Sequence, residues 1–102
     1  MTVDYEQSGD VLYARLSGEL DEHTASSVRT SLDNLIEVKH FRCLVLDFKD
    51  VDFMDSTGVG MVLGRFKKLK KSGKSLLLKR PNSQVLKVFK SCGLLEILET
   101  EI

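Results

Sequence analysis

The chain has 102 residues, of which 42% are hydrophobic and 29% are charged, values typical of a folded globular protein. Its length suits one domain, residues 1–102, and its composition excludes an intrinsically disordered or collagen-like chain. Two cysteines, Cys43 and Cys92, are too few for a disulfide framework and favour a reducing, cytoplasmic setting. No apolar run approaches the roughly 20 residues that a membrane helix needs, so no membrane partner is expected.

The net charge is zero, but acidic and basic residues are segregated along the chain. Residues 1–55 hold twelve acids and five bases, whereas residues 65–90 hold ten bases and no acid. Such a basic stretch is either a solvated helix face or a contact surface for a charged partner. Aromatic residues do not alternate with these lysines, so the stretch lacks a stacking platform and predicts no direct binding of nucleic acid.

The first part of the chain predicts a hairpin followed by a helix. Residues 3–7 and 11–17 are typical strands, and the glycine-containing turn between them makes the pair antiparallel. Apolar residues then recur at helical spacing and predict a helix over residues 21–37. Asp21 or Thr24 is expected to cap its first turn.

The middle of the chain predicts a buried strand and a second helix. The nearly continuous apolar run 43–48 is typical of a central strand covered on both faces, and we expect a loop over residues 50–55. A helix follows from residue 56 to residue 71. Gly60 and Gly64 lie four residues apart on it, so we expect them to let the helix approach the sheet closely.

The last part of the chain predicts a buried strand over residues 75–79, a third helix and a short strand over residues 94–99. The third helix starts at Pro81-Asn82-Ser83 and ends at Gly93. The order is β-β-α-β-α-β-α-β, and a strand–helix–strand unit of this kind is a parallel, right-handed crossover. The fold class is therefore α/β, a mixed sheet of four to five strands with helices packed against it.

One candidate site lies where the central strand passes into the second helix, at residues 53–60 (Phe-Met-Asp-Ser-Thr-Gly-Val-Gly). This segment departs from the motifs of aspartic proteases, dinucleotide-binding loops, phosphate-binding loops and nucleophile elbows, so it predicts no catalytic residue. The histidines and cysteines lack the spacing of a zinc site, so no metal ion is expected. What remains is Ser56 beside Asp55, either a helix-capping serine or a functional hydroxyl.

Two phrases resemble the signatures of STAS domains, the anti-sigma factor antagonists. The first is residues 17–25, Ser-Gly-Glu-Leu-Asp-Glu-His-Thr-Ala, and the second is residues 53–67, which begins with the segment above. Both phrases together, at this separation and in this order of strands and helices, are most similar to the sporulation members that oppose the anti-sigma F factor. The resemblance covers essentially the whole chain and implies a STAS fold and a protein that is not an enzyme.

The resemblance also implies a switch. The protein would bind an anti-sigma factor that is also a serine kinase and so release a sigma factor; the kinase would phosphorylate Ser56, and a PP2C-type phosphatase would reverse the step. Thr57 stands where the sporulation members have a second serine, so it is a rival but less favoured acceptor. No cofactor is implied, and the free protein is expected to be a monomer. The implied partner-binding residues are Asp21, Thr24, Asp55, Ser56, Thr57, Gly58 and Gly60.

Other functions stay open at this point. A general-stress regulator of the same family would carry the same phrases. A nucleotide- or small-ligand-binding module could use the edge formed by residues 18–21 and 55–58, although the chain lacks a phosphate-binding loop. A nucleic-acid binder could use residues 67–74, in which case its binding would depend steeply on salt.

Overall fold

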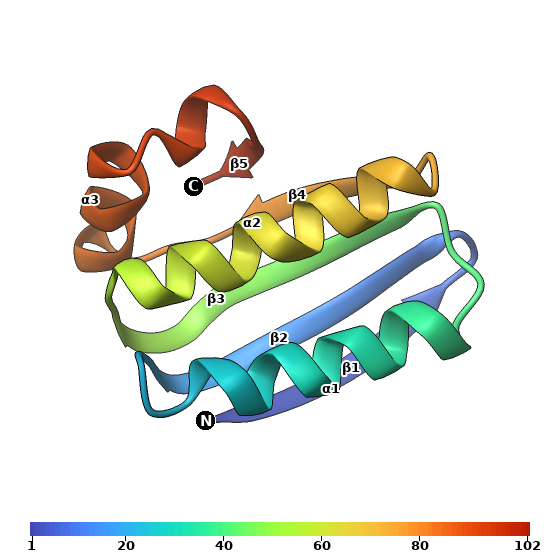
Figure 1. Ribbon diagram of the computed structural model, residues 1–102, viewed down its shortest axis with the longest axis horizontal. Coiled ribbons are helices and arrows are strands. Elements are labelled where there is room, and N and C mark those ends of the chain that lie inside the picture. Colours follow the sequence, from blue (N-terminus) through green and yellow to red (C-terminus); the bar gives the residue numbers. More distant parts are fainter.

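The computed structural model describes residues 1–102 as a five-stranded sheet with α1 and α2 side by side over one face (Figure 1). The strands are β1 (Thr2–Ser8), β2 (Val11–Leu20), β3 (Cys43–Met54), β4 (Ser75–Lys79) and β5 (Glu99–Glu101). The helices are α1 (Ala25–Val38), α2 (Ser56–Lys71), α3 (Ser83–Ser91) and the 3-10 helix η1 (Leu94–Glu96). No helix is long and apolar enough to cross a bilayer.

The five strands lie in the order β1-β2-β3-β4-β5. β1 is antiparallel to β2, and every other neighbouring pair is parallel. α1 connects β2 to β3 and α2 connects β3 to β4, as expected for parallel strands, which need a crossover. Both the element order and the mixed sheet confirm the predicted fold class.

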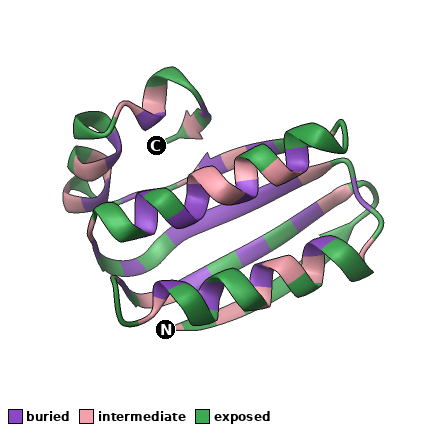
Figure 2. Ribbon diagram, viewed as in Figure 1, coloured by how far each residue is buried: buried purple, intermediate pink, exposed green.

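The hydrophobic core lies between the sheet and the two helices that cover it. Along β2 buried and exposed residues alternate, whereas the first half of β3 is buried almost without interruption (Figure 2). The buried stripe of α1 is Ala25, Val28, Leu32 and Ile36. α3 joins the core through Phe89, whose ring packs edge-to-face against Phe48 of β3 with the ring centroids 5.3 Å apart. The apolar positions that recur at helical or strand spacing are therefore buried in the core, as their spacing predicts.

The central strand is longer than predicted. Residues 50–54 continue β3 instead of forming a loop, because they pair with the second half of β2, from Ser17 opposite Asp50 to Leu20 opposite Met54. One register shift precedes this pairing, between Arg15 and Ser17, and a second lies within it, between Gly18 and Glu19. The extension carries the chain directly to the start of α2.

The last strand is also displaced from its predicted position. Gly93 has a φ of +72° and ends α3, after which Leu94–Glu96 form a 3-10 turn rather than a strand. Leu94 and Leu98 are buried, so this turn is held against the core. β5 then pairs with β4 only over Glu99–Glu101.

Gly60 and Gly64 do not face the sheet. A Cβ atom built on either glycine would meet nothing within 4 Å, and both residues line the hollow between α1 and α2. The prediction that they bring α2 close to the sheet is therefore wrong. That role belongs to Gly58, which lies nearer the start of the helix.

The face of the sheet opposite α1 and α2 carries a row of alternating charges. Strand register places residues with charges −, +, −, + and − directly opposite one another on the five strands. They are Asp4, Arg15, Asp47, Lys79 and Glu101. Opposite charges facing each other across neighbouring strands favour the pairing, so this row supports the register of the sheet.

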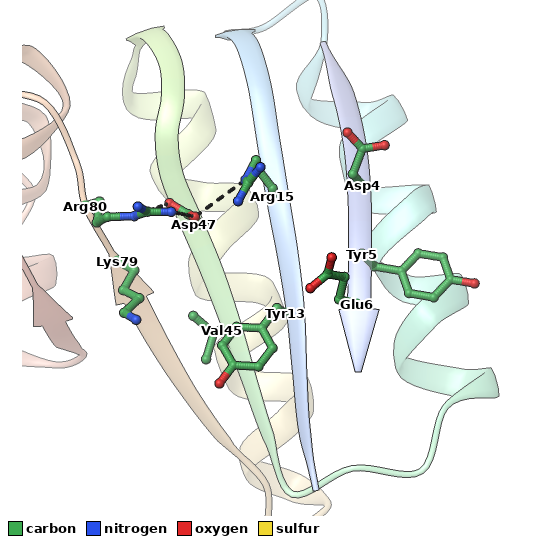
Figure 3. Close-up of a pocket in the computed structure, with 9 residues that line it drawn as sticks. All are labelled: Asp4, Tyr5, Glu6, Tyr13, Arg15, Val45, Asp47, Lys79 and Arg80. Carbon is green, nitrogen blue, oxygen red and sulfur yellow. Dashed lines mark hydrogen bonds and ion pairs between the residues drawn. The ribbon is translucent and has the colours of Figure 1, made fainter. Parts of the chain in front are cut away.

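Asp47 is the centre of the row and is buried. Its carboxylate accepts hydrogen bonds from the guanidinium of Arg80, and Nε of Arg15 lies 3.7 Å away (Figure 3). Burial alone would raise the pKa of Asp47. The hydrogen bonds from Arg80 and from the backbone N–H of Lys49, with the charges of both arginines, instead hold this pKa below its usual value.

Replacing Asp47 should therefore change how stability depends on pH. Because the pKa is lowered in the folded state, ionised Asp47 stabilises the fold above pH ~4 and this contribution disappears as the pH falls further. We expect Asp47→Asn to unfold more easily at pH 7 and to lose less stability on acidification, as measured by urea unfolding at a series of pH values. Asp52→Asn, at an exposed position of the same strand, is the control. A wild-type pH profile in Asp47→Asn would contradict this prediction.

Candidate functional site

The two sequence phrases meet at the carboxyl ends of β2 and β3. Leu20 lies opposite Met54 in the sheet, and the carbonyl of Leu20 accepts the N–H of Asp55 at 3.2 Å. α1 and α2 then start side by side at this end of the sheet (Figure 1). The edge formed by residues 18–21 and 55–58 is thus a real feature of the structure.

The start of α2 is capped by Asp55 and not by Ser56. Asp55 has an extended backbone, and its Oδ1 accepts the N–H groups of Thr57 at 2.9 Å and Gly58 at 3.3 Å. A carboxylate suits this place because it satisfies free N–H groups and complements the positive end of the helix dipole. The interpretation of Ser56 as the capping serine is therefore wrong.

Ser56 is the first residue of α2, and it is exposed. Its hydroxyl takes no part in the hydrogen bonds that hold the helix start, because the carboxylate beside it does that work. The hydroxyl is thus presented to solvent on a helix start that is fixed without it. This arrangement suits a group that a partner protein modifies.

Thr57 is exposed too, but it lies in a different environment. It lines a hollow of about 490 Å³ between α1 and α2, together with Gly60, Gly64 and residues of α1. Ser56 does not line that hollow. Successive helical residues point about 100° apart, so the two hydroxyls face different directions and cannot replace one another in a docked active site.

Gly58 fixes how closely α2 starts against the strand ends. A Cβ on Gly58 would lie 2.8 Å from Cε and 2.9 Å from Cγ of Met54, and 3.0 Å from Cγ of Leu20. The side chains of both neighbours are fully buried and have little room to move. Gly58 itself is buried, so its part in the site is to set the position of the helix start.

The turn before α1 is held by Asp21 and Thr24. Oδ1 of Asp21 accepts the N–H groups of His23 at 2.9 Å and Thr24 at 3.2 Å. Oγ1 of Thr24 donates to the carbonyl of Glu19 at 2.8 Å and accepts the N–H of Asp21 at 3.0 Å. α1 begins at Ala25 with Thr24 at its N-cap position, which is one of the two predicted residues, but no side chain makes a capping hydrogen bond there. Asp21 braces the turn before the helix instead.

The hollow between α1 and α2 contains charged residues that sequence reasoning missed. Glu22 and Arg29 of the α1 side and Arg65 of α2 line it beside Thr57. Arg65 is buried, and its Nε lies 2.9 Å from Oδ1 of Asp33 in α1. The sequence contains one signal for this cluster, because Arg65 stands at a position whose helical spacing predicts burial. Only the packing of α1 against α2 shows that Arg65 contacts Asp33. No group of three His, Cys, Asp or Glu side chains is arranged to bind a metal ion.

Comparison with known proteins identifies related sequences over nearly the whole chain. The family model of the STAS domain matches residues 2–102. An anti-sigma F factor antagonist of Paenibacillus polymyxa is 36% identical over 98 residues, which cover 96% of this chain and 84% of the relative. An anti-sigma-B factor antagonist of Bacillus subtilis (strain 168) is 34% identical over 99 residues, which cover 97% of this chain and 89% of the relative.

The structure is also similar to a solved anti-sigma factor antagonist, SpoIIAA. In its unphosphorylated form that protein superimposes with a TM-score of 0.82 and 31% identity, over 97% of this chain and 87% of the other. Its phosphorylated form from Bacillus gives a TM-score of 0.73 and 30% identity, over 97% and 90% of the two chains. The family model, the relatives and the fold agree with the two sequence phrases, and the chain belongs to the STAS domain family.

Proposed function

We propose that this protein is an anti-anti-sigma factor. In its unphosphorylated form it binds an anti-sigma factor that is also a serine kinase and so releases a sigma factor, and phosphorylation of Ser56 inactivates it. The relatives named as antagonists of anti-sigma factors support this role, and a phosphorylated form of SpoIIAA supports the switch. The observation that carries the proposal is the exposed hydroxyl of Ser56 on a helix start that Asp55 already caps.

A phosphate on Ser56 alters the surface while the fold is kept. It adds about −1.5 to −2 charges at pH 7, which the N–H groups and dipole at a helix start tolerate. In a complex, this dianion would be desolvated close to Asp55, and burying an uncompensated charge costs several kcal/mol. A tenfold loss of affinity needs only about 1.4 kcal/mol. Phosphorylation can therefore lower the affinity for the anti-sigma factor enough to release the protein without any refolding.

The remaining parts of the proposal follow from the same role. A PP2C-type phosphatase removes the phosphate, the chain acts in the cytoplasm as a monomeric single STAS domain, and the partner contacts Asp21, Thr24 and residues 55–60. It needs no cofactor and does not act as an enzyme. Relatives that oppose both anti-sigma F and anti-sigma-B factors align over most of the chain, so the sporulation role has a general-stress role as its alternative.

Binding to purified partners tests the proposed function. The probes are the anti-sigma factors with a serine-kinase domain that are encoded in the genome carrying this chain, each titrated calorimetrically in the presence of ADP. We expect one of them to bind and to release its sigma factor in a competition assay. Failure of every such probe to bind the unphosphorylated protein would overturn the proposal.

A substitution at Asp21 tests whether the negative charge at this edge contributes to partner binding, independently of the stability of the fold. Asp21→Asn keeps the Oδ1 acceptor for the N–H groups of His23 and Thr24 but removes the negative charge. We expect thermal stability to stay within about 0.5 kcal/mol of the wild type. We further propose that Asp21 contacts a basic group of the kinase, so affinity for the anti-sigma factor should fall. Unchanged affinity in the calorimetric titration would reduce Asp21 to a residue that braces the turn.

A further inference from the structure

β3 extends beyond β4 at the end of the sheet that carries Ser56. β4 pairs with β3 only from Ser75 opposite Cys43 to Lys79 opposite Asp47, whereas β3 continues to Met54. Residues 48–54 therefore have β2 on one side and no strand on the other. Buried backbone N–H and carbonyl groups in such a segment need other partners.

Two amide side chains at the start of α3 take the place of the missing strand. α3 lies at this same end of the sheet, beside the start of α2 (Figure 1). Nδ2 of Asn82 donates to the carbonyl of Val51 at 3.1 Å. Gln84 bonds to Met54 twice, because its Oε1 accepts the N–H at 3.0 Å and its Nε2 donates to the carbonyl at 2.9 Å. The side chain of Gln84 thus supplies both bonds that a neighbouring strand would supply.

The start of α2 rests on Met54. The fully buried side chain of Met54 packs directly under Gly58, with no room for a Cβ between them. Asp55 follows at once, and its carboxylate holds the N–H groups of Thr57 and Gly58. A shift of the Met54 backbone would move this cap and the helix start together, and with them the hydroxyl of Ser56.

The geometry points to Gln84 as a positioning residue for phosphorylation of Ser56. This inference rests on the proposed function, because it concerns the reaction at that hydroxyl. Gln84 acts through Met54: its two hydrogen bonds hold the end of β3 from the α3 side, while Leu20 holds Asp55 from the β2 side. Reactions between docked groups are sensitive to such placement, and a displacement of about 1 Å can cost about 100-fold in rate.

Gln84→Met tests this role because methionine keeps the length and volume of the side chain but makes neither hydrogen bond. With the anti-sigma factor kinase found in the binding test and ATP, we expect kcat for Ser56 phosphorylation to fall about tenfold or more. KM should change less than about threefold, since the rest of the docking surface is unaltered. A wild-type kcat in Gln84→Met would overturn the inference.

Asn82→Ala is the matched control on the same turn. It removes the bond to Val51 and the cap that Oδ1 of Asn82 gives to the N–H of Val85, but it leaves both bonds to Met54. We expect this variant to be less stable to heat than Gln84→Met while its kcat stays within about threefold of the wild type. A loss of kcat that merely follows stability in the two variants would assign Gln84 a structural role only, and would also overturn the inference.

Amide hydrogen exchange in the free protein gives a readout without the kinase. If Gln84 holds the helix start through Met54, the amides of Thr57 and Gly58 should exchange about tenfold faster in Gln84→Met, and those within α1 should not change. Unchanged exchange at Thr57 and Gly58 would overturn the positioning role. A wild-type protein that no partner kinase phosphorylates would instead overturn the proposed function, and with it the reaction that Gln84 serves, so the two failures are distinguishable.

Discussion

Treatment with the cognate anti-sigma factor kinase and ATP is expected to add one phosphate to the protein, on Ser56. Ser56 and Thr57 are both exposed, but Thr57 lines the hollow between α1 and α2 and Ser56, the first residue of α2, lies outside it. Only one of two neighbouring hydroxyls can face a docked active site, because successive helical residues point about 100° apart. Tandem mass spectrometry of the treated protein locates the phosphate directly.

The variants at this position separate the switch from the fold. Ser56→Ala should abolish phosphorylation and bind the anti-sigma factor permanently. Its free energy of unfolding should stay within about 0.5 kcal/mol of the wild type, because Asp55 and not Ser56 caps the helix. Ser56→Asp should weaken binding only in part, because it adds one charge where the phosphate adds about two.

The matched control is Thr57→Ala, which should still accept a phosphate at the neighbouring serine. Calorimetric titration of the wild type before and after complete phosphorylation measures the switch itself, and we expect the affinity to fall at least about tenfold, equivalent to about 1.4 kcal/mol. Phosphate found solely on Thr57, or full affinity in the Ser56-phosphorylated protein, would refute the proposed switch.

Gly58→Ala is expected to be the most damaging of the glycine substitutions within α2. The added Cβ would lie 2.8 Å from Met54 and 3.0 Å from Leu20, both fully buried. Overpacking of this kind typically costs about 1–3 kcal/mol, and part of the strain should be relieved by displacement of the start of α2. We therefore expect lower stability in urea unfolding and weaker binding to the anti-sigma factor.

Gly64→Ala provides the opposite result within the same helix. A Cβ at this position meets nothing within 4 Å, so only the helix propensity changes. Alanine is better than glycine inside a helix by about 0.8–1.0 kcal/mol, so this variant should be more stable than the wild type. Equal effects of the two substitutions would contradict the close contact at Gly58.

Much of the fold could be predicted because it depends on neighbours along the chain. The hairpin turn, the apolar stripes of α1 and α2 and the run of residues 43–48 are local patterns with periods that distinguish helices from strands. The parallel arrangement follows from the connections, since a helix between two strands requires a crossover. The same local phrases carry the family resemblance, which is why the STAS fold can be predicted from the sequence.

The details of the site depended on contacts between distant segments. That β3 reaches Met54 depends on pairing with the end of β2. The alternation of polar and apolar residues over 50–53 is compatible with a strand, but it is too short to distinguish a strand from a loop. Which glycine α2 needs depends on Met54 and Leu20 beneath it, since glycine has no side chain whose pattern could show the contact. The amide bonds of Gln84 join residues 30 positions apart.

The sequence by itself therefore determined most of the elements, their order, the family and the candidate acceptor Ser56, but not where β3 and β5 lie in full. The tertiary structure alone decided that Asp55 caps the helix, that the two neighbouring hydroxyls have different surroundings and that α3 braces the end of β3. The physical reason is that helix and strand periods arise from the local backbone, whereas capping, close approach and hydrogen-bond partners depend on where the rest of the chain comes to lie.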